Sequence, residues 1–523
     1  MAQQQSEDRR GPQGRRKASI PRRVERGGGG KAVPVNQQTA QLGLRFGTAE
    51  NSAARAAGAD GRAERHRSRS ATYAAPKPKR TAQQATSATM EDVTQRLREA
   101  FAHVASNHGA PGPDRQTIDQ GREHLEELLP QLQTALLEGT YEPGNLRRVW
   151  IPKVGGGQRG LGIPNVVDRM VAEAVRLGLE PLYEPTCHGS SHGFRPGRSC
   201  QTAIAEARQH LEAGYEWVVD RDVEHFFNRV HHQRLLARLA QRVRDRRVLR
   251  LIRQMLKAKV VRPDGVVVRT DEGVPQGGPL SPLLRNLVLD ELDWELARRG
   301  HRFVRYADDS NIYVRSERAG QRVMASITQC IEKRLRLQVN AEKSAVAHPE
   351  ERHFLGFRLR REPMEGHVEV LLSTRSKERL DEKIRVLVPR KWGGSLTACM
   401  HQLNGYLLGW IGYFGICTAG VETTLKGLDA HIRRRLRAVQ LAHWKRKRTI
   451  AKKLIRLGIR RQSAWRSVYE GRKSLWAMSH MSTVDRALRN GYWTERGLVS
   501  LAERWRTMHQ NIAVPVQLPL ALG

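Results

Sequence analysis

Two adjacent carboxylates, Asp308 and Asp309, stand at a predicted tight turn. The apolar runs at 303–306 and 311–314 on either side are typical of two β-strands. Like charges at such short range repel each other, which raises the energy of the site when no cation is bound. Mg²⁺ prefers oxygen ligands and commonly takes one or two carboxylates together with substrate phosphates. The pair therefore indicates a divalent metal site, although Asp is also common in solvated turns.

A two-metal site for nucleotide transfer needs a third carboxylate, because one ion activates the attacking oxygen and the other steadies the leaving group. Asp222 is the candidate, since it follows the strongly β-prone run at 217–219. Asp220 is its rival, because residues two apart in a strand face the same side. Either residue, with Asp308 and Asp309, would complete a Mg²⁺-dependent site of three carboxylates.

Several motifs accompany these carboxylates in one order. Asp-x4-Phe at 222–227 precedes Gly-Val-Pro-Gln-Gly-Gly-Pro-Leu-Ser-Pro at 273–282, and Tyr-Ala-Asp-Asp at 306–309 follows. This order resembles the palm of reverse transcriptases. The surrounding segments resemble the reverse transcriptases encoded by bacterial group II introns, over about residues 91–505. These segments are Trp-Ile-Pro-Lys at 150–153, Leu-Gly-Ile-Pro at 161–164, His-Gly-Phe-Arg-Pro-Gly-Arg-Ser at 192–199, Ala-Glu-Lys-Ser at 341–344 and Phe-Leu-Gly-Phe at 354–357.

The resemblance implies a role for each carboxylate. Asp222, rather than Asp220, matches the first metal-binding Asp, and Asp308 and Asp309 match the other two. The implied reaction is the attack of a primer 3′-OH on the α-phosphate of a dNTP, directed by an RNA template and assisted by two Mg²⁺ ions. Phe227 matches a bulky residue that rejects the ribose 2′-OH, and its alternative role is that of an ordinary core phenylalanine.

Four further residues match positions around the incoming nucleotide. Lys153 and Arg159 flank the glycine turn at 155–157 and are implied to hold the triphosphate, a task suited to these side chains. Gln276 lies in a loop implied to support the templating base, where glycines permit close backbone approach. Lys343 matches a lysine near the triphosphate, a possible proton donor to the departing pyrophosphate.

Some positions depart from the family pattern. Gly160 stands where Pro, Lys or Leu is usual in the fingertip turn, and Asn228 replaces a common Asp. Pro113 and Arg115 interrupt the usual Gly-Val-Asp-Gly pattern. Many relatives continue with an endonuclease that has paired cysteines, whereas 26 residues without cysteine follow Gly497 here. We therefore expect a protein similar to the compact class C type, without an endonuclease domain.

The charge of the chain indicates a polyanionic partner. The 523 residues include 90 Lys and Arg against 53 Asp and Glu, a net charge of +37. Residues 431–456 alone carry 11 basic residues and no acid. Arg433, Arg434 and Arg437 can share one face of a helix there. We expect this face to bind RNA or DNA phosphates, because a solvated surface with this charge would repel itself.

The pattern of the chain predicts an α+β fold, the right-hand polymerase, followed by an all-α thumb and a basic helical region. Residues 1–90 should form a disordered basic arm, because they offer little apolar surface to bury. The fingers and palm are expected at 91–374, and the thumb at 375–440, where it resembles domain X of the maturases. A basic DNA-binding region at 441–505 and a tail at 506–523 complete the predicted order.

We therefore expect an RNA-directed DNA polymerase that aids the splicing and retrohoming of a group II intron. Its expected partners are an RNA template, structured intron RNA, a DNA primer or target, and dNTPs. The alternatives are a domesticated reverse transcriptase in phage defence or DNA repair, and an RNA-binding splicing factor. Unpaired cysteines, the lack of a signal peptide and the lack of any long apolar stretch predict a cytoplasmic protein with no membrane contact.

Overall fold

The computed structural model describes residues 88–510 except for 153–155, 225, 227–228, 271, 363–365, 391, 419 and 471–473. The side chain of Glu224 is also outside this set. All but the last three residues of the predicted basic arm, and most of the predicted tail, lie outside the described residues.

The described chain begins with four helices; the first three pack on a long fifth one, and the fourth packs on the first and third. The first helical segment begins at Met90 and is divided at Arg96 into two helices. Thr89 caps the first of them, because its hydroxyl accepts from the backbone N–H of Asp92 while the Asp92 carboxylate accepts from the backbone N–H of Thr89. The elements are α1 (Met90–Gln95), α2 (Leu97–Ser106), α3 (Ile118–Glu123), α4 (Leu125–Glu138) and α5 (Val166–Tyr183).

A small sheet follows, in the strand order β2-β1-β5-β6. β1 (Leu146–Pro152) and β2 (Gln158–Ile163) form a hairpin and pair antiparallel. β5 (Val260–Val261) lies parallel to β1, and β6 (Val267–Val268) is antiparallel to β5. This sheet carries Arg159, one of the residues predicted to hold the triphosphate.

A second sheet carries the carboxylates, in the order β10-β3-β8-β7. Its strands are β3 (Trp217–Arg221), β7 (Arg302–Tyr306), β8 (Asp309–Val314) and β10 (Ala345–Ala347), all joined antiparallel. The two strands predicted around Asp308 and Asp309 are thus confirmed.

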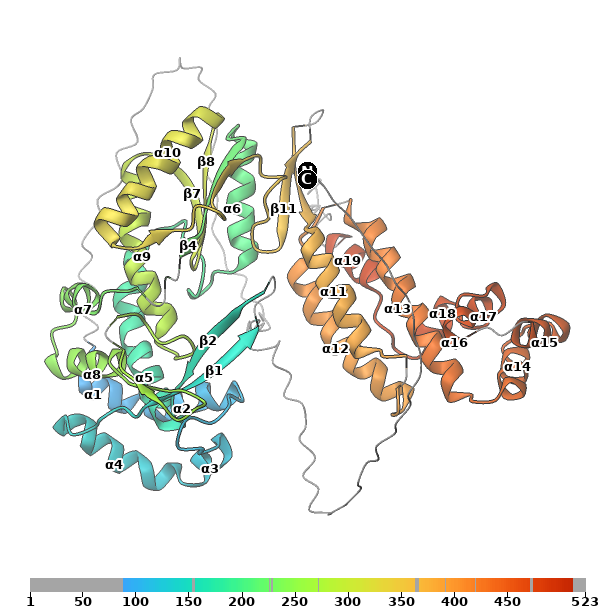
Figure 1. Cartoon of the computed structure of the whole chain (residues 1–523), viewed down its shortest axis with the longest axis horizontal. Coiled ribbons are helices and arrows are strands. Elements are labelled where there is room, and N and C mark those ends of the chain that lie inside the picture. Colours follow the sequence, from blue (N-terminus) through green and yellow to red (C-terminus); the bar gives the residue numbers. More distant parts are fainter. Residues whose placement is uncertain are drawn as a thin grey trace, which may run out of the picture. The chain divides into compact units, whose positions relative to one another are not determined.

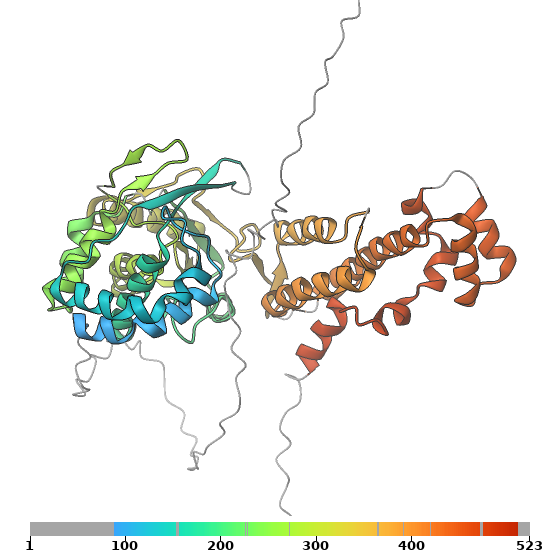
Figure 2. The same ribbon diagram turned by 90° about the horizontal axis from the view of Figure 1, so that it is seen from below.

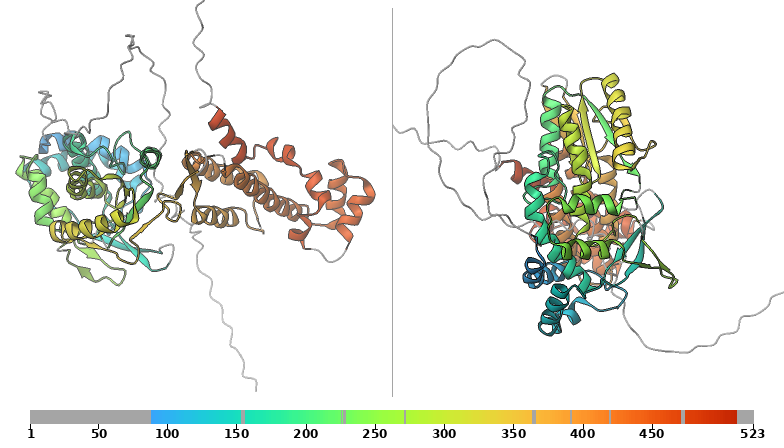
Figure 3. Two further views of the ribbon diagram at one scale, coloured as in Figure 1. Left: turned by 90° about the horizontal axis from the view of Figure 1, so that it is seen from above. Right: turned by 90° about the vertical axis from the view of Figure 1, so that its left-hand side faces the viewer.

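Helices cover both faces of this second sheet. Val219, Phe303 and Ile312 pack in one apolar cluster with α9 (Ser281–Arg298) and α10 (Glu317–Cys330). On the opposite face, Val218 and Tyr313 pack with α6 (Cys200–Glu212). Figures 1 and 3 show the strands between α6 on one side and α10 on the other. Neighbouring residues of a strand point to opposite faces, so both faces of this sheet are buried.

Smaller elements connect these layers. They are a 3-10 helix at Glu184–Thr186, β4 (Val223–Glu224), α7 (His232–Ala240), α8 (Arg246–Leu256), a π-helical turn at Ile331–Leu335, and β9 (Gln338–Val339), which pairs with β4.

From residue 374 onward the described chain is helical, as predicted. A hairpin of β11 (Phe357–Arg361) and β12 (Val368–Leu372) precedes it. Neighbouring α11, α12 and α13 can be followed in Figure 2. α13 continues through residue 440, where the sequence predicted a domain boundary. The helices are α11 (Thr374–Leu387), α12 (Leu396–Phe414), α13 (Val421–His443), α14 (Lys447–Arg456), α15 (Arg461–Tyr469), α16 (Leu475–Met478), α17 (Ser482–Ala487), α18 (Asn490–Thr494) and α19 (Leu501–Gln510).

The predicted fold class, α+β followed by an all-α region, is confirmed. None of the helices in the described part of the chain is both long enough and apolar enough to cross a membrane.

Candidate active site

The turn between β7 and β8 carries two of the predicted metal carboxylates. Tyr306 pairs with Asp309 across the hairpin, so only Ala307 and Asp308 lie between them. Ala307 has a φ of 60°, a left-handed conformation that is uncommon for a residue with a side chain. The surrounding structure must therefore hold this turn in place.

A buried arginine holds the turn from behind. Nη1 of Arg305 donates to the carbonyl oxygen of Ala307 at 2.8 Å and to Oδ1 of Asn286 at 3.0 Å. Nε and Nη2 of Arg305 bind the carboxylate of Asp293 at 2.8 and 2.6 Å. Arg305 and Asp293 are 1% and 0% exposed, so this pair is closed to water. Since α9 carries both Asn286 and Asp293, the helix fixes the backbone of the turn.

The His-Gly-Phe-Arg-Pro motif packs directly against the same turn. The backbone N–H of His192 donates to the carbonyl of Arg305 at 2.8 Å, and Asn286 Nδ2 donates to the carbonyl of Gly193 at 2.9 Å. A Cβ atom on Gly193 would stand 2.3 Å from the backbone nitrogen of Ala307. Only glycine fits there, which explains why the motif has glycine at this position.

Asp222 and its rival Asp220 have different environments at the end of β3. The carboxylate of Asp220 accepts from Nε of Arg352 at 2.8 Å and lies 2.6 Å from its Nη2 atom. Oδ2 of Asp222 lies 3.7 Å from the Nζ atom of Lys343, whose side chain is mostly exposed. Asp220 is therefore engaged by a fork of two N–H groups, whereas Asp222 has only a loose ion pair. These contacts favour Asp222 as the metal ligand.

The three carboxylates influence one another electrostatically. Asp309 is exposed to solvent at the rim of the site, although many protein atoms lie around its carboxylate. This desolvation, with the negative charges of Asp308, Asp220 and Asp222, raises the pKa of Asp309 to about 7. Burial also raises the pKa of Asp222, with Lys343 opposing the shift and Asp308 adding to it. A divalent cation would relieve this repulsion.

The donor set fits a hard divalent cation, since it consists of carboxylate oxygens. Within the described ranges, however, no three acidic, His or Cys side chains already stand close enough together to hold a metal ion. Two of the three carboxylates face cations of the protein instead: Asp222 faces Lys343, and Asp308 binds Nη1 of Arg285 at 2.9 Å. For all three carboxylates to bind one divalent cation, the side chains of Lys343 and Arg285 must therefore move away from Asp222 and Asp308.

The residues predicted around the nucleotide are only partly described. Arg159 lies exposed on β2, opposite Ile151. Lys153 and Phe227 lie outside the described residues. A Cβ atom on Gly160 would stand 2.6 Å from Nη1 of Arg148. The departure from the family pattern at Gly160 therefore leaves room for a neighbouring side chain of the hairpin.

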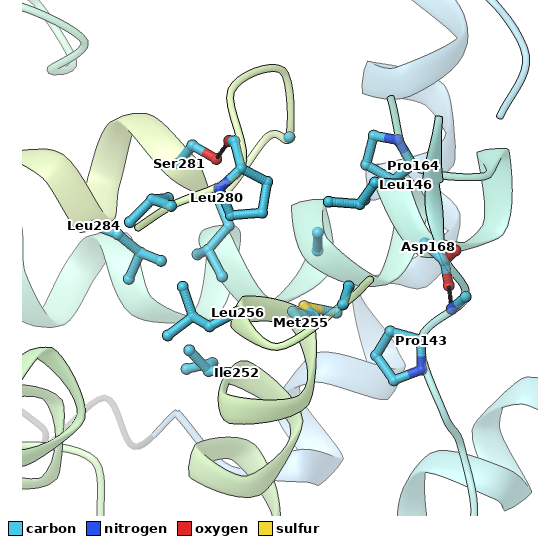
Figure 4. A pocket seen from close by; sticks show the side chains of 16 residues that line it. Pro143, Leu146, Pro164, Asp168, Ile252, Met255, Leu256, Leu280, Ser281 and Leu284 are labelled. Carbon is cyan, nitrogen blue, oxygen red and sulfur yellow. Dashed lines mark hydrogen bonds between the residues drawn. The ribbon is translucent and has the colours of Figure 1, made fainter. Parts of the chain in front are cut away.

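The glycine-rich loop that contains Gln276 is attached to the fingertip sheet. The backbone N–H of Gly162, in β2, donates to the carbonyl of Gln276 at 2.8 Å. Ser281 Oγ donates to the carbonyl of Pro275 at 2.5 Å, which ties the loop to the start of α9. An apolar pocket lies under the loop, with Pro275 and Ser281 among its lining residues (Figure 4). The loop thus connects the fingertip strands with the helix behind the carboxylates.

The predicted cationic face of α13 is only partly open. Arg433 and Arg434 are half-buried, and the guanidinium of Arg434 lies 4.2 Å from the centre of the Trp476 ring. Arg437 points inward, 6% exposed, and forms an ion pair with Asp485. Burial, then repulsion by Arg433 and Arg434, lowers the pKa of Arg437 to about 10. The three arginines are neighbours, as predicted, but of these three only Arg433 and Arg434 are open enough to solvent to contact a nucleic acid.

Sequence reasoning missed the residues that support the turn and those that neutralise it. Asn286, Asp293 and Arg285 all lie on α9, and Arg305 lies in β7. Polar residues at helical spacing among the leucines of the segment 283–296 were a signal for part of this set. That signal does not identify Arg305 as their partner, because the contact depends on how α9 packs on the sheet.

Residues 151–359 match the family model of the reverse transcriptase (RNA-dependent DNA polymerase), and residues 377–457 match that of the group II intron, maturase-specific domain. Protein YkfC of Escherichia coli K12 is 33% identical over 354 residues, which cover 59% of this chain and 89% of YkfC. The group II intron-encoded protein LtrA of Lactococcus lactis is 37% identical over 196 residues, 37% of this chain and 32% of LtrA. The putative COX1/OXI3 intron 2 protein of Saccharomyces cerevisiae is 27% identical over 327 residues, 51% of this chain and 38% of that protein.

Proposed function

The chain belongs to the reverse transcriptases that carry a group II intron maturase-specific domain, and from this premise we propose that Asp222, Asp308 and Asp309 form its Mg²⁺-dependent polymerase site. The observation that carries the proposal is the pairing of β3 with β8, in which Arg221 lies opposite Ser310, so that Asp222 lies at the same end of the sheet as Asp308 and Asp309. Reverse transcriptases generally use divalent metal ions, and a bound pair of ions activates the primer hydroxyl and stabilises the leaving pyrophosphate.

The side chains of this site would then bind the cations and orient the substrates. Asp222, Asp308 and Asp309 would hold the cations, and Arg305 keeps the turn from moving while charge develops. Arg159, together with Lys153, would bind the triphosphate, and Gln276 would support the templating base. A new bond joins the primer 3′-oxygen to the α-phosphorus as the bond to the bridging oxygen of pyrophosphate breaks. Lys343 would supply a proton to that leaving group.

Replacing single carboxylates tests the site. Asp308→Asn and Asp222→Asn should lower Mg²⁺-dependent cDNA synthesis on a primed RNA by about a thousandfold or more, because a metal ligand contributes several kcal/mol to the transition state. Asp220→Asn is the matched control, since its carboxylate is bound by Arg352. Template affinity should be nearly unchanged in all three variants. An inactive Asp220→Asn beside an active Asp222→Asn would reverse the assignment.

We further propose that the chain binds structured intron RNA and aids splicing and retrohoming, with a DNA primer or target and dNTPs as its other substrates. The match of residues 377–457 to the maturase-specific domain supports this role. The half-buried arginines Arg433 and Arg434 lie within that segment and suit phosphate contacts.

The splicing role is tested with the catalytically inactive protein. Asp308→Asn changes the metal site and leaves the arginines of α13 unaltered. It should therefore still promote splicing of an intron RNA found around the reading frame, at near-physiological Mg²⁺. Loss of splicing in Asp308→Asn, with RNA affinity retained, would contradict a splicing role independent of polymerisation.

A further inference from the structure

Arg285 places a fixed positive charge beside one of the three carboxylates. Its Nη1 atom donates to Oδ1 of Asp308 at 2.9 Å, and the Arg285 side chain is 9% exposed. The guanidinium also lies 5.6 Å from the centre of the Phe194 ring. Arginine keeps its proton in proteins, so this charge persists under all ordinary conditions.

A divalent ion would have to share Asp308 with this guanidinium. If Arg285 stays in place, the two cations repel each other across a single carboxylate. If Arg285 withdraws, it gives up a charge-assisted hydrogen bond in a place where water cannot fully replace it. In both cases Arg285 makes the binding of a divalent ion less favourable than it would be at a neutral residue.

Lys343 presents the opposite situation at Asp222. Its side chain is 68% exposed and its Nζ atom is 3.7 Å from the Asp222 carboxylate, so it can turn into solvent when a cation binds. Arg285 is enclosed between α9, the β7–β8 turn and Phe194, and its charge stays near the site. Of these two cations, Arg285 is the one that a metal ion cannot easily displace.

We propose that Arg285 is a resident counter-cation of the metal site: it neutralises Asp308 in the metal-free protein and raises the concentration of divalent ion needed to fill the site. The inference rests on the proposed role of Asp308 as a metal ligand. Arg285 forms an ion pair with Asp308, and Lys343 forms one with Asp222. Both contacts agree with the finding that, within the described residues, no three acidic, His or Cys side chains already stand together as a metal site.

Direct metal binding tests the proposal without reference to activity. Binding of Mn²⁺ to the full-length protein, free of nucleic acid and dNTP, would be followed by the electron paramagnetic resonance signal of the free ion. Arg285→Met removes the charge and keeps an unbranched side chain near Phe194. Its Kd for Mn²⁺ should fall by about tenfold or more, because charges a few ångströms apart repel to this extent even at the dielectric constant of water.

Two matched variants isolate the charge of Arg285. Arg285→Lys keeps a cation and should bind Mn²⁺ nearly as the wild type does. Arg298→Met removes an arginine from the other end of α9, where the side chain is 67% exposed, and should leave the Kd unchanged. Circular dichroism would check folding, and Arg285→Gln would replace Arg285→Met if the latter failed to fold.

An unchanged or higher Kd for Arg285→Met would overturn the proposal. So would a higher KM for dNTP at saturating Mn²⁺ with an unchanged Kd for Mn²⁺, which would assign Arg285 to substrate binding instead. RNA-directed primer extension by the same preparations separates the two ideas. An inactive wild-type protein would contradict the proposed function. If the wild type is active but the Kd for Mn²⁺ of Arg285→Met equals that of the wild type, only the proposed role of Arg285 is contradicted.

Discussion

The buried pair of Arg305 and Asp293 should stabilise the fold and position the carboxylate turn through separable contacts. In Asp293→Asn the shape is kept, but the guanidinium of Arg305 loses its counter-charge where it is only 1% exposed. Leaving one partner of such a buried pair uncompensated typically costs about 3–5 kcal/mol in the free energy of unfolding. Urea denaturation followed by circular dichroism would measure this loss.

An exposed ion pair between α2 and α4 serves as the control. Arg98 and Glu126 are 63% and 71% exposed and bind at 2.6 Å. Glu126→Gln should cost about 1 kcal/mol or less, because solvent screens exposed pairs. A cost for Asp293→Asn no larger than that for Glu126→Gln would refute the assignment of Arg305 and Asp293 as a strong buried pair.

A double variant separates stability from positioning. Replacing both partners with apolar residues, as in Arg305→Met with Asp293→Leu, removes the uncompensated charge and should recover most of the lost stability. It cannot restore the 2.8 Å hydrogen bond to the carbonyl of Ala307. We therefore expect the double variant to have a lower kcat for primer extension than the wild type, with little change in KM for dNTP. Full recovery of kcat would show that Arg305 has no positioning role.

Three further predictions follow from the site. Gly193→Ala should lower both stability and kcat because its new Cβ meets the turn at 2.3 Å, whereas Gly189→Ala, with open space around it, should do neither. Since the folded pKa of Asp309 is raised to about 7, the contribution of Asp309 to the stability of the metal-free protein should fall from pH 4 to pH 7, so Asp309→Asn should melt higher than the wild type at pH 8 but not at pH 4. Replacing Arg433 and Arg434 with Gln should weaken RNA binding and make its log–log dependence on salt shallower, measured by filter binding, while primer extension at saturating template persists.

Local pattern in the sequence was enough to predict the two strands around the carboxylates, the helical end of the chain and a divalent metal site. The period of apolar residues indicated the helices and the two strands around Asp308 and Asp309, and the strands and turn found there agree. These predictions succeed because strand alternation, helical spacing and turn preferences act over a few residues. The resemblance of ordered motifs added the reaction class, which the family matches confirm.

Tertiary packing decided what surrounds each of these residues. Arg352, 132 positions away from Asp220 in the chain, binds that carboxylate and so favours Asp222 as the metal ligand. Asp485 meets Arg437 and turns it inward, although its position on the helix predicted a place on the nucleic-acid face. Such contacts join residues far apart in the chain, and their partners follow from how helices pack on sheets. Local propensity carries no information about that packing.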